Sequence, residues 1–389
     1  MKAILRQIAG LCLLCASTSA FAGNLSVGYD EAWFADNYPD WLASNPVYNL
    51  LFQPSQFPSK FSTTSSVMDA YFATMASGGA KIVRIWVFPG LQGIQLDLSQ
   101  PPGKQTVGLT LDAKGNPELI GNLQTVFIKA KKYGLQVQVT ALNGVDMQAV
   151  VDPTSRLHPL QAYFENVLLN NGGERDNFKK KVLLPLLNLF NATATDENGM
   201  RFQIREVIYG LDVINEIEAP LIAGYFPTYW LGARDFNQDM AKYAKWNSSV
   251  QVTSSAGFSF AAFEILAGLF SGLGLNFYDL HAYADYGLYP GLTLVCGRVL
   301  ADRVPIILGE YGQSSQTTDN NLQSLTTASF LFRAKATCYS AALAWMYQTN
   351  LTPQFKYICT TPGDPLCKYP PLANGIGFRP AYFVIQSFH

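Results

Sequence analysis

Two glutamates in this chain each follow an apolar, β-branched run of residues. Glu216 comes after Leu211–Asn215, and Glu310 comes after Val304–Gly309. A carboxylate at the end of a buried strand is poorly solvated, so it needs a charged partner or a chemical role. Two such carboxylates that converge on one cleft are the groups that glycoside hydrolysis requires. We therefore take Glu216 and Glu310 as the candidate catalytic pair.

Further polar side chains fall on the inward face of other strand-like runs, because successive residues of a strand alternate between faces. In Ile82–Val87, Arg84 lies opposite the aliphatic face. A buried guanidinium requires anions, and a strand-end glutamate would serve; a purely structural ion pair is the alternative. His281 and Tyr283 end the run that starts at Phe277, where they could orient a carboxylate or a sugar hydroxyl. A lone histidine there is more often a core residue.

Three tryptophans are candidate platforms for a sugar ring. Trp345 lies in the last apolar run, Trp86 shares a face with Arg84, and Trp33 follows the first run. Most aromatic side chains of a barrel are core or scaffold, so packing is the alternative role for each of them.

The elements that must position these residues alternate between apolar runs and amphipathic segments. Most of the runs lack polar alternation, which is typical of parallel strands covered on both faces. Eight β/α units favour a single (β/α)8 barrel (TIM barrel) over an open doubly wound sheet. No G-x-G-x-x-G follows the first strand, so a dinucleotide fold lacks its main support. The predicted strands are Ser26–Tyr29, Ile82–Val87, Leu135–Ala141, Glu206–Ile214, Val250–Thr253, Phe277–Leu280, Pro305–Gly309 and Ala341–Met346.

Helical patterns lie between these runs, and several connections are long. In a barrel, the long connections after the second, third and eighth strands project from the C-terminal face, where they would form the walls of a cleft. These connections are residues 89–122, 143–173 and 347–377. The predicted helices include Leu123–Tyr133, Arg175–Phe190, Phe236–Ala244 and Leu322–Ser340.

The N-terminal 22 residues have the pattern of a secretory signal peptide. Lys2 and Arg6 precede a short apolar core, Ile8–Cys15, and Ala20–Ala22 is a small-x-small cleavage site. The apolar run is too short to span a bilayer. We expect cleavage near Ala22 and Gly23 and a secreted or periplasmic protein whose residues 23–389 form one catalytic domain.

The composition excludes several kinds of partner. The formal net charge is −1, which argues against nucleic acid or an anionic membrane surface as a partner. With 49% hydrophobic and 14% charged residues, the chain can bury a large core. No later segment has the pattern of a membrane span. We expect a monomer without a cofactor.

Four cysteines follow the predicted signal peptide, and in an exported protein they indicate two disulfides. Cys359 and Cys367 flank a turn-rich segment that could form a local loop, which leaves Cys296 with Cys338 on what we expect to be neighbouring helices. Free buried thiols are the alternative. No cysteine has zinc-ligand spacing to a histidine, so we expect no metal site.

Taken in order, these residues resemble glycoside hydrolase clan A, and most closely family 5, which holds cellulases and β-mannanases. The order covers nearly the whole chain after the signal peptide. Five elements carry the resemblance, on strands two, four, six, seven and eight: Arg84, Asn215-Glu216, His281-x-Tyr283, Glu310 and Trp345. One element departs from family 5, because Asn143 stands near the position after the third strand where a histidine is usual.

The resemblance implies retaining hydrolysis of β-glycosidic bonds by double displacement. Glu216 would be the general acid/base and Glu310 the nucleophile, with Glu218 as the alternative acid. It also implies supporting roles for Arg84 and Tyr283 at Glu310, and sugar or site contacts for Asn215, Asn143, His281 and Trp345.

The expected substrate is a cellulose- or mannan-type glycan. Two alternatives stay open, a glycan-binding barrel without turnover and a transglycosylase on the same scaffold. A serine esterase is disfavoured, because no G-x-S-x-G motif is present.

Overall fold

The computed structural model describes most of the chain after the predicted signal peptide. The predicted signal peptide (residues 1–22), Trp33 and most of the segment 347–377 lie outside the described residues. The described residues are 24–32, 64–101, 104–111, 115, 117–146, 159–170, 172–219, 228–257, 260–284, 289–312, 319–347, 357–359, 366–367 and 377–388.

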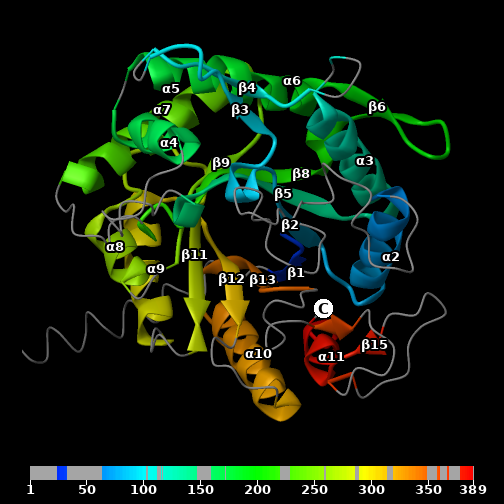
Figure 1. Ribbon diagram of the computed structural model, residues 1–389. Helices are drawn as coiled ribbons and strands as arrows, with labels where there is room; N and C mark the ends of the chain where they lie inside the picture. Colours follow the sequence, from blue (N-terminus) through cyan, green and yellow to red (C-terminus); the bar gives the residue numbers. More distant parts are fainter. Residues whose placement is uncertain are drawn as a thin grey trace, which may run out of the picture.

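A ring of parallel strands forms the centre of the molecule, surrounded by helices (Figure 1). The strand order is β10-β11-β12-β13-β1-β2-β5-β8-β9. Only Ser254 separates β9 from β10, so these two short strands together form the fifth strand and join the two ends of the sheet. The predicted (β/α)8 barrel is confirmed. Its strands are β1 (Ser26–Asp30), β2 (Ile82–Trp86), β5 (Gln136–Asn143), β8 (Ile208–Asn215), β9 (Val252–Thr253), β10 (Ser255–Ala256), β11 (Tyr278–Tyr283), β12 (Ile306–Gly312) and β13 (Tyr339–Ala344).

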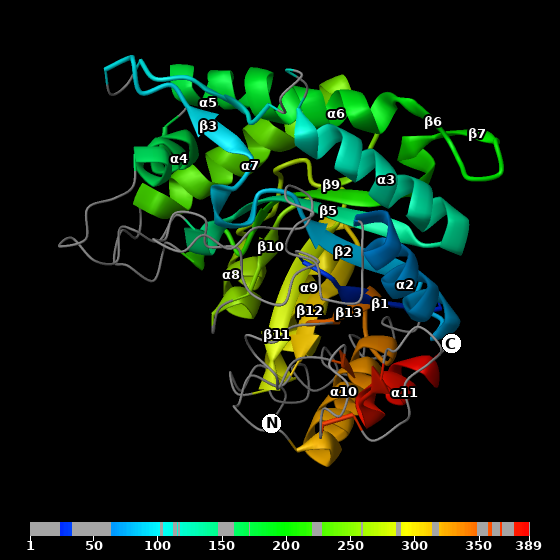
Figure 2. The ribbon, with the colours of Figure 1, turned by 45° about the vertical axis from the view of Figure 1, so that its right-hand side comes forward.

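The helices pack their apolar faces on the outer side of this ring. α11 lies beside α10 at the end of the chain, as Figures 1 and 2 both show. The helices are α2 (Thr64–Ser77), α3 (Glu118–Tyr133), α4 (Pro159–Leu169), α5 (Gly173–Phe178), α6 (Leu184–Asn191), α7 (Thr228–Asn247), α8 (Ala261–Ala267), α9 (Tyr289–Asp302), α10 (Asn320–Lys335) and α11 (Pro380–Gln386). The short hairpins are β3 (Ile94–Leu96) with β4 (Val107–Leu109), β6 (Thr193–Thr195) with β7 (Arg201–Gln203), and β14 (Ile358–Cys359) with β15 (Gly377–Phe378).

Several predicted boundaries were wrong, and for two of them a strand pairing or a hydrogen bond explains the difference. The predicted helix ending at Ser340 stops at Lys335, since Tyr339 already pairs with Ile306 of β12 and starts β13. The fourth strand, predicted to start at Glu206, starts two residues later, at Ile208. Glu206 lies in a 3-10 turn, where its carboxylate accepts the backbone N–H of Gln203.

The barrel interior has an apolar floor beneath a polar layer. Five residues form the floor, a buried cluster apart from the main core: Ile82, Phe277, Ile307, Ala341 and Leu343. Further along the same strands, toward the C-terminal face, the fully buried Arg84 and Asp279 replace the aliphatic side chains. The main apolar core lies between the strands and the helices. Buried charge is therefore concentrated toward the end of the barrel where Glu216 and Glu310 lie.

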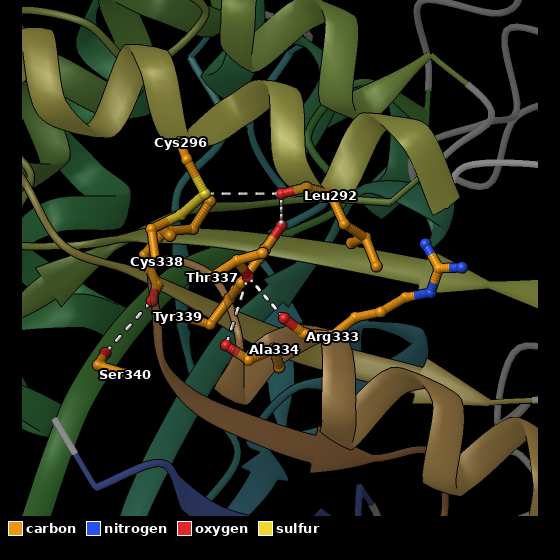
Figure 3. The surroundings of a disulfide bond; sticks show 9 residues. Leu292, Cys296, Arg333, Ala334, Thr337, Cys338, Tyr339 and Ser340 are labelled. Carbon is orange, nitrogen blue, oxygen red and sulfur yellow. Dashed lines mark hydrogen bonds between the residues drawn. A yellow bond between two sulfur atoms is a disulfide. The ribbon is translucent and has the colours of Figure 1, made fainter. Parts of the chain in front are cut away.

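A disulfide joins Cys296 to Cys338, as predicted, with the two Cα atoms 5.7 Å apart (Figure 3). Cys296 is in α9, but Cys338 lies in the turn before β13 and not on a neighbouring helix, because α10 ends three residues earlier. Beside this bond, the Tyr339 hydroxyl donates to the Leu292 carbonyl at 3.0 Å. Cys367 is also disulfide-bonded. The Cys359 side chain lies outside the described residues, so the Cys359–Cys367 pair stays a prediction.

We expect the double variant Cys296→Ser/Cys338→Ser to unfold more easily than the wild type. The bond closes a loop of 42 residues, and loss of such a cross-link costs roughly 2–4 kcal/mol of unfolding free energy. Urea denaturation followed by tryptophan fluorescence measures the change. As a control, a reductant should lower the wild-type midpoint at least as far as the substitutions do. An unchanged midpoint for the variant would contradict a stabilising role.

None of the helices in the described part of the chain is long and apolar enough to cross a membrane.

Candidate active site

Glu216 and Glu310 lie close together at the C-terminal ends of their strands. One oxygen of each carboxyl group lies within 4.8 Å of the other, and His281 Nδ1 is within the same distance of both. The Glu310 side chain is 2% exposed and that of Glu216 is 13% exposed. The two glutamates that sequence reasoning paired are therefore neighbours, with Glu216 the more accessible.

The backbone leaves β8 sharply at Glu216. This residue has a φ of 46°, in the left-handed region that few non-glycine residues adopt. Its N–H donates to Ser255 Oγ at 3.0 Å, which fixes the turn to the fifth strand. Gly257 makes room for the carboxyl group, because a Cβ atom there would lie 2.1 Å from Glu216 Oε1. The turn and the missing side chain together direct Glu216 into the barrel mouth.

Arg84 connects the carboxylates inside the barrel. Its Nη1 donates to Glu310 Oε1 at 2.5 Å and to Asp30 Oδ1 at 2.9 Å. Its Nη2 donates to Asp212 Oδ2 at 2.8 Å and to Asn215 Oδ1 at 2.7 Å. A planar guanidinium held on both nitrogens presents a fixed edge to Glu310. The contact expected between Arg84 and a strand-end glutamate is thus present, with two aspartates added to it.

Tyr283 and Arg84 approach Glu310 on different oxygens. The Tyr283 hydroxyl donates to Glu310 Oε2, while Arg84 takes Oε1. Among the described residues, no lysine or arginine contacts Glu216 in this way. Its carboxylate contacts His281 Nδ1 at 3.0 Å, and that nitrogen is also 3.4 Å from Glu310 Oε1. The surroundings favour charge on Glu310 more than on Glu216.

The acidities of the two carboxyl groups follow from these contacts. Burial raises the pKa of Glu310 to about 7, although Arg84 and the Tyr283 hydroxyl act to lower it. Burial also raises the pKa of Glu216 well above its ordinary value of 4.5, and the nearby charges of Glu310 and Glu218 add to the rise. Glu310 is the carboxyl group with its own cation and donor, so we expect it to lose its proton first.

Of the other site residues predicted from the sequence, some lie near Glu216 and Glu310 and one lies outside the described residues. Asn215 Nδ2 donates to Asn143 Oδ1 at 3.0 Å, which brings Asn143 to the site. The rings of Trp86 and Trp345 lie 5.5 Å apart, and the Arg84 guanidinium lies 5.6 Å from the Trp86 ring centre. Trp33 lies outside the described residues.

Glu218, the alternative acid, is buried rather than exposed in a loop. Its Oε1 accepts the backbone N–H of Gly257, on the segment that packs against Glu216. It is therefore a structural neighbour of the pair, and its charge contributes to the raised pKa of Glu216.

Three buried aspartates near Arg84 were not among the predicted site residues. Asp30 ends β1, Asp212 lies within β8 and Asp279 lies within β11, and all three are fully buried. The signal for them was present in the sequence, because each interrupts or ends an apolar run. The sequence did not show that the three aspartates lie together, because that depends on which strands are neighbours in the ring.

Glu216, His281 and Glu310 form the one group of three potential metal ligands found in the described part of the chain. A guanidinium already contacts Glu310 at 2.5 Å, so a cation balances part of the negative charge that a metal would neutralise. We interpret the cluster as a carboxylate pair balanced by Arg84 and not as a metal centre.

The sequence matches no family model and no curated protein. Solved structures do resemble it. The β-mannanase of the blue mussel Mytilus edulis aligns with a TM-score of 0.53 and 16% identity, over 83% of this chain and 86% of the mussel protein. The endo-1,4-β-D-mannanase of Thermotoga petrophila aligns with a TM-score of 0.54 and 14% identity, over 94% and 99% of the two chains. This chain has the same fold as these β-mannanases.

The β-glycosidase of Thermosphaera aggregans has the same fold, with a TM-score of 0.53, 12% identity and coverage of 94% of this chain and 95% of that one. The predicted resemblance to clan A and family 5 is thereby confirmed for the fold. In a (β/α)8 barrel the C-terminal ends of the strands are where side chains can gather at a single mouth, and there this chain places Glu216, Glu310, Arg84 and Tyr283.

Proposed function

We propose that this protein is a secreted glycoside hydrolase that cleaves a β-linked glycan with retention of configuration. The observation that carries the proposal is the pair Glu216 and Glu310, with carboxyl oxygens within 4.8 Å and unequal surroundings. Retaining glycosidases separate their two carboxyl groups by about 5–5.5 Å, whereas inverting enzymes leave about 6.5–9.5 Å for a water molecule. The shorter spacing supports direct attack on the anomeric carbon.

In the proposed mechanism Glu310 is the nucleophile and Glu216 the general acid/base. Arg84 and Tyr283 hold Glu310 charged and fix both of its oxygens. Glu216 keeps its proton in a buried position next to other negative charge, and it donates that proton to the leaving oxygen. A covalent glycosyl–enzyme forms at Glu310, and water activated by Glu216 then hydrolyses it.

The substrate we propose to test first is β-1,4-mannan. Two of the three structural neighbours described above are named as mannanases. Trp345 and Trp86, with rings 5.5 Å apart, would form an aromatic wall for a pyranose ring. Asn215, whose oxygen is held by Arg84, has a second amide hydrogen for a sugar hydroxyl. A reducing-sugar assay on mannan, glucomannan, cellulose and xylan tests the proposal. Release from none of these β-glycans would contradict it.

Retention is tested separately by the anomer that forms first. We expect proton NMR of a fresh digest to show the β-anomer of the new reducing end before mutarotation. The reason is that two successive inversions at one carbon restore its configuration. An initial α-anomer would show that water attacks directly and that Glu310 acts as a base.

The pH profile of kcat/KM should be bell-shaped, with both limbs displaced upward. Activity requires Glu310 ionised, so it should rise with pH through the pKa of Glu310, which burial raises above 4.5. Activity also requires Glu216 protonated, so it should fall as pH passes the pKa of Glu216, which burial and the charges of Glu310 and Glu218 raise well above 4.5. Initial rates on a soluble glycan between pH 4 and 10 measure both limbs. A profile flat down to pH 4 would contradict the raised pKa of Glu310.

A further inference from the structure

Two buried polar atoms face each other inside the barrel, and neither has a hydrogen-bond partner among the described residues. They are His281 Nε2 and Asp279 Oδ1, which lie 3.7 Å apart. Both side chains are fully buried and project from the same face of β11. An unsatisfied donor or acceptor in such a position is costly, so this pair calls for an explanation.

Neighbouring strands hold the Asp279 carboxyl group in place. Gln138 Nε2, on β5, donates to Asp279 Oδ2 at 2.6 Å, so Oδ2 is the accepting oxygen. On β12, Gly309 leaves space for Oδ1, because a Cβ atom there would lie 1.8 Å from it. With Oδ2 occupied, Oδ1 is directed at the His281 ring.

Burial, and after it the negative charges of Asp212 and Glu310, favour the neutral form of Asp279, while Arg84 and the hydrogen bond from Gln138 oppose them. One cation, Arg84, faces three carboxyl groups besides Asp279, and burial raises the pKa of Asp279 well above its ordinary value. Burial and Arg84 lower the pKa of His281, so its ring is neutral and carries one proton. The charged and titratable groups that act on Asp279 from other strands are Arg84, Asp30, Asp212, Glu310 and Tyr209.

We propose that Asp279 is a positioning residue, a neutral carboxyl group whose Oδ1–H donates to His281 Nε2. His281 then carries its single proton on Nδ1, because a neutral imidazole has one donor and one acceptor nitrogen. Nδ1 is the nitrogen that lies 3.0 Å from Glu216 Oε1 and 3.4 Å from Glu310 Oε1. The ring proton is thus placed between the two catalytic carboxyl groups.

The His281 Nδ1–H can therefore reach the negative charge at both stages of the reaction. This step of the inference rests on the proposed function. In the free enzyme the charge is on Glu310. Once Glu216 has given its proton to the leaving oxygen and Glu310 is esterified, the charge is on Glu216. A donor within reach of both oxygens can follow the charge from one to the other without a conformational change.

The tautomer can be measured without any substrate. The chain has only three histidines, His158, His281 and His389, so 15N labelling of histidine gives few ring signals, and His281→Gln identifies those of residue 281. We expect Nδ1 of His281 to carry the proton and Nε2 to show the shift of an unprotonated nitrogen. A protonated Nε2 in the wild-type protein would overturn the proposal, whatever the enzyme turns over.

Two substitutions separate a neutral Asp279 from an ionised one. In Asp279→Asn the amide N–H can still donate to His281 Nε2 and the amide oxygen can still accept from Gln138, so the wild-type tautomer should persist. Asp279→Leu removes the donor, and its kcat should fall on the order of tenfold or more below that of Asp279→Asn. If Asp279 were instead an anion that accepts from Nε2–H, Asp279→Asn would move the ring proton from Nε2 to Nδ1. Its kcat would then fall further than that of Asp279→Leu.

Asp302→Asn is the matched control, because it alters a carboxyl group that accepts from Ser271 and Tyr278 instead of from the site. It should leave the His281 ring signals unchanged.

If Asp279→Leu does not fold, the wild-type and Asp279→Asn spectra are sufficient to show which nitrogen of His281 carries the proton. If the proton is on Nδ1 in the wild-type protein but on Nε2 in Asp279→Asn, the proposed role of Asp279 would also be overturned. Absence of activity on every glycan, with the predicted tautomer present, would contradict the proposed function and leave the proton placement standing.

Discussion

Glu310→Ala should abolish turnover on every β-glycan, including aryl glycosides with good leaving groups. Without the proposed nucleophile no glycosyl–enzyme can form, and loss of such a group lowers kcat on the order of 10⁵-fold or more. The change should not unfold the protein, because Arg84 keeps its contacts with Asp30 and Asp212. Initial rates on an aryl β-mannoside, beside circular dichroism of the same sample, measure the two effects.

A small anion distinguishes a nucleophile from a structural carboxylate. Azide can occupy the space left in Glu310→Ala, where the Arg84 guanidinium and the Tyr283 hydroxyl that held the carboxylate face it. We expect azide to restore activity on the activated substrate and to give an α-glycosyl azide, since the attack is now a single inversion. The control is Glu310→Gln, which fills the space and should not be rescued. Residual wild-type activity in Glu310→Ala without azide would remove Glu310 from the mechanism.

Glu216→Ala should fail in a different way that depends on the leaving group. A natural glycan needs its leaving oxygen protonated, and loss of a general acid costs about 10²–10⁴-fold. A dinitrophenyl glycoside needs no proton, so it should still glycosylate Glu310. The intermediate should then accumulate, because in the proposed mechanism Glu216 also activates the water that hydrolyses it. A burst of dinitrophenol followed by slow turnover, with a mass increase of one glycosyl unit, is the expected measurement.

Two matched variants control the Glu216 experiment. Glu218→Gln keeps the shape of the buried neighbour that accepts from Gly257 and should retain the leaving-group pattern of the wild type. Glu206→Ala removes an exposed carboxylate of the 3-10 turn. If Glu216→Ala lost no more activity on natural glycans than Glu206→Ala does, the acid would be wrongly assigned. Glu218 would be the residue to test next.

Much of this site was predictable, because parallel strands in a barrel obey simple rules. Alternation along the second strand placed Arg84 opposite the aliphatic face, and the structure puts it inside the barrel in contact with Glu310. The same rule placed His281 and Tyr283 on one face of the sixth strand, and both reach the glutamate pair. The strand-end positions of Glu216 and Glu310 brought them to a common mouth, since all strands of the ring point the same way.

Other features could not be predicted, because they depend on distances between strands far apart in sequence. Asp30, Asp212 and Glu310 meet at one guanidinium only because the closed ring directs their side chains inward from different strands. Cys338 was predicted on a helix because residues 322–340 show no clear break, but pairing of Tyr339 with Ile306 ends the helix early. Neither outcome is contained in the local pattern of hydrophobic residues.

The sequence by itself determined the eight β/α units, the inward face of the strands and the two glutamates, because hydrophobic periodicity and strand ends are local properties of the chain. Only the tertiary structure decided which of the buried carboxyl groups are protonated and which are ionised. Burial of four carboxyl groups around one arginine sets which of them keep their protons. Desolvation and charge coupling act through space over a few ångströms, and no spacing along the chain encodes them.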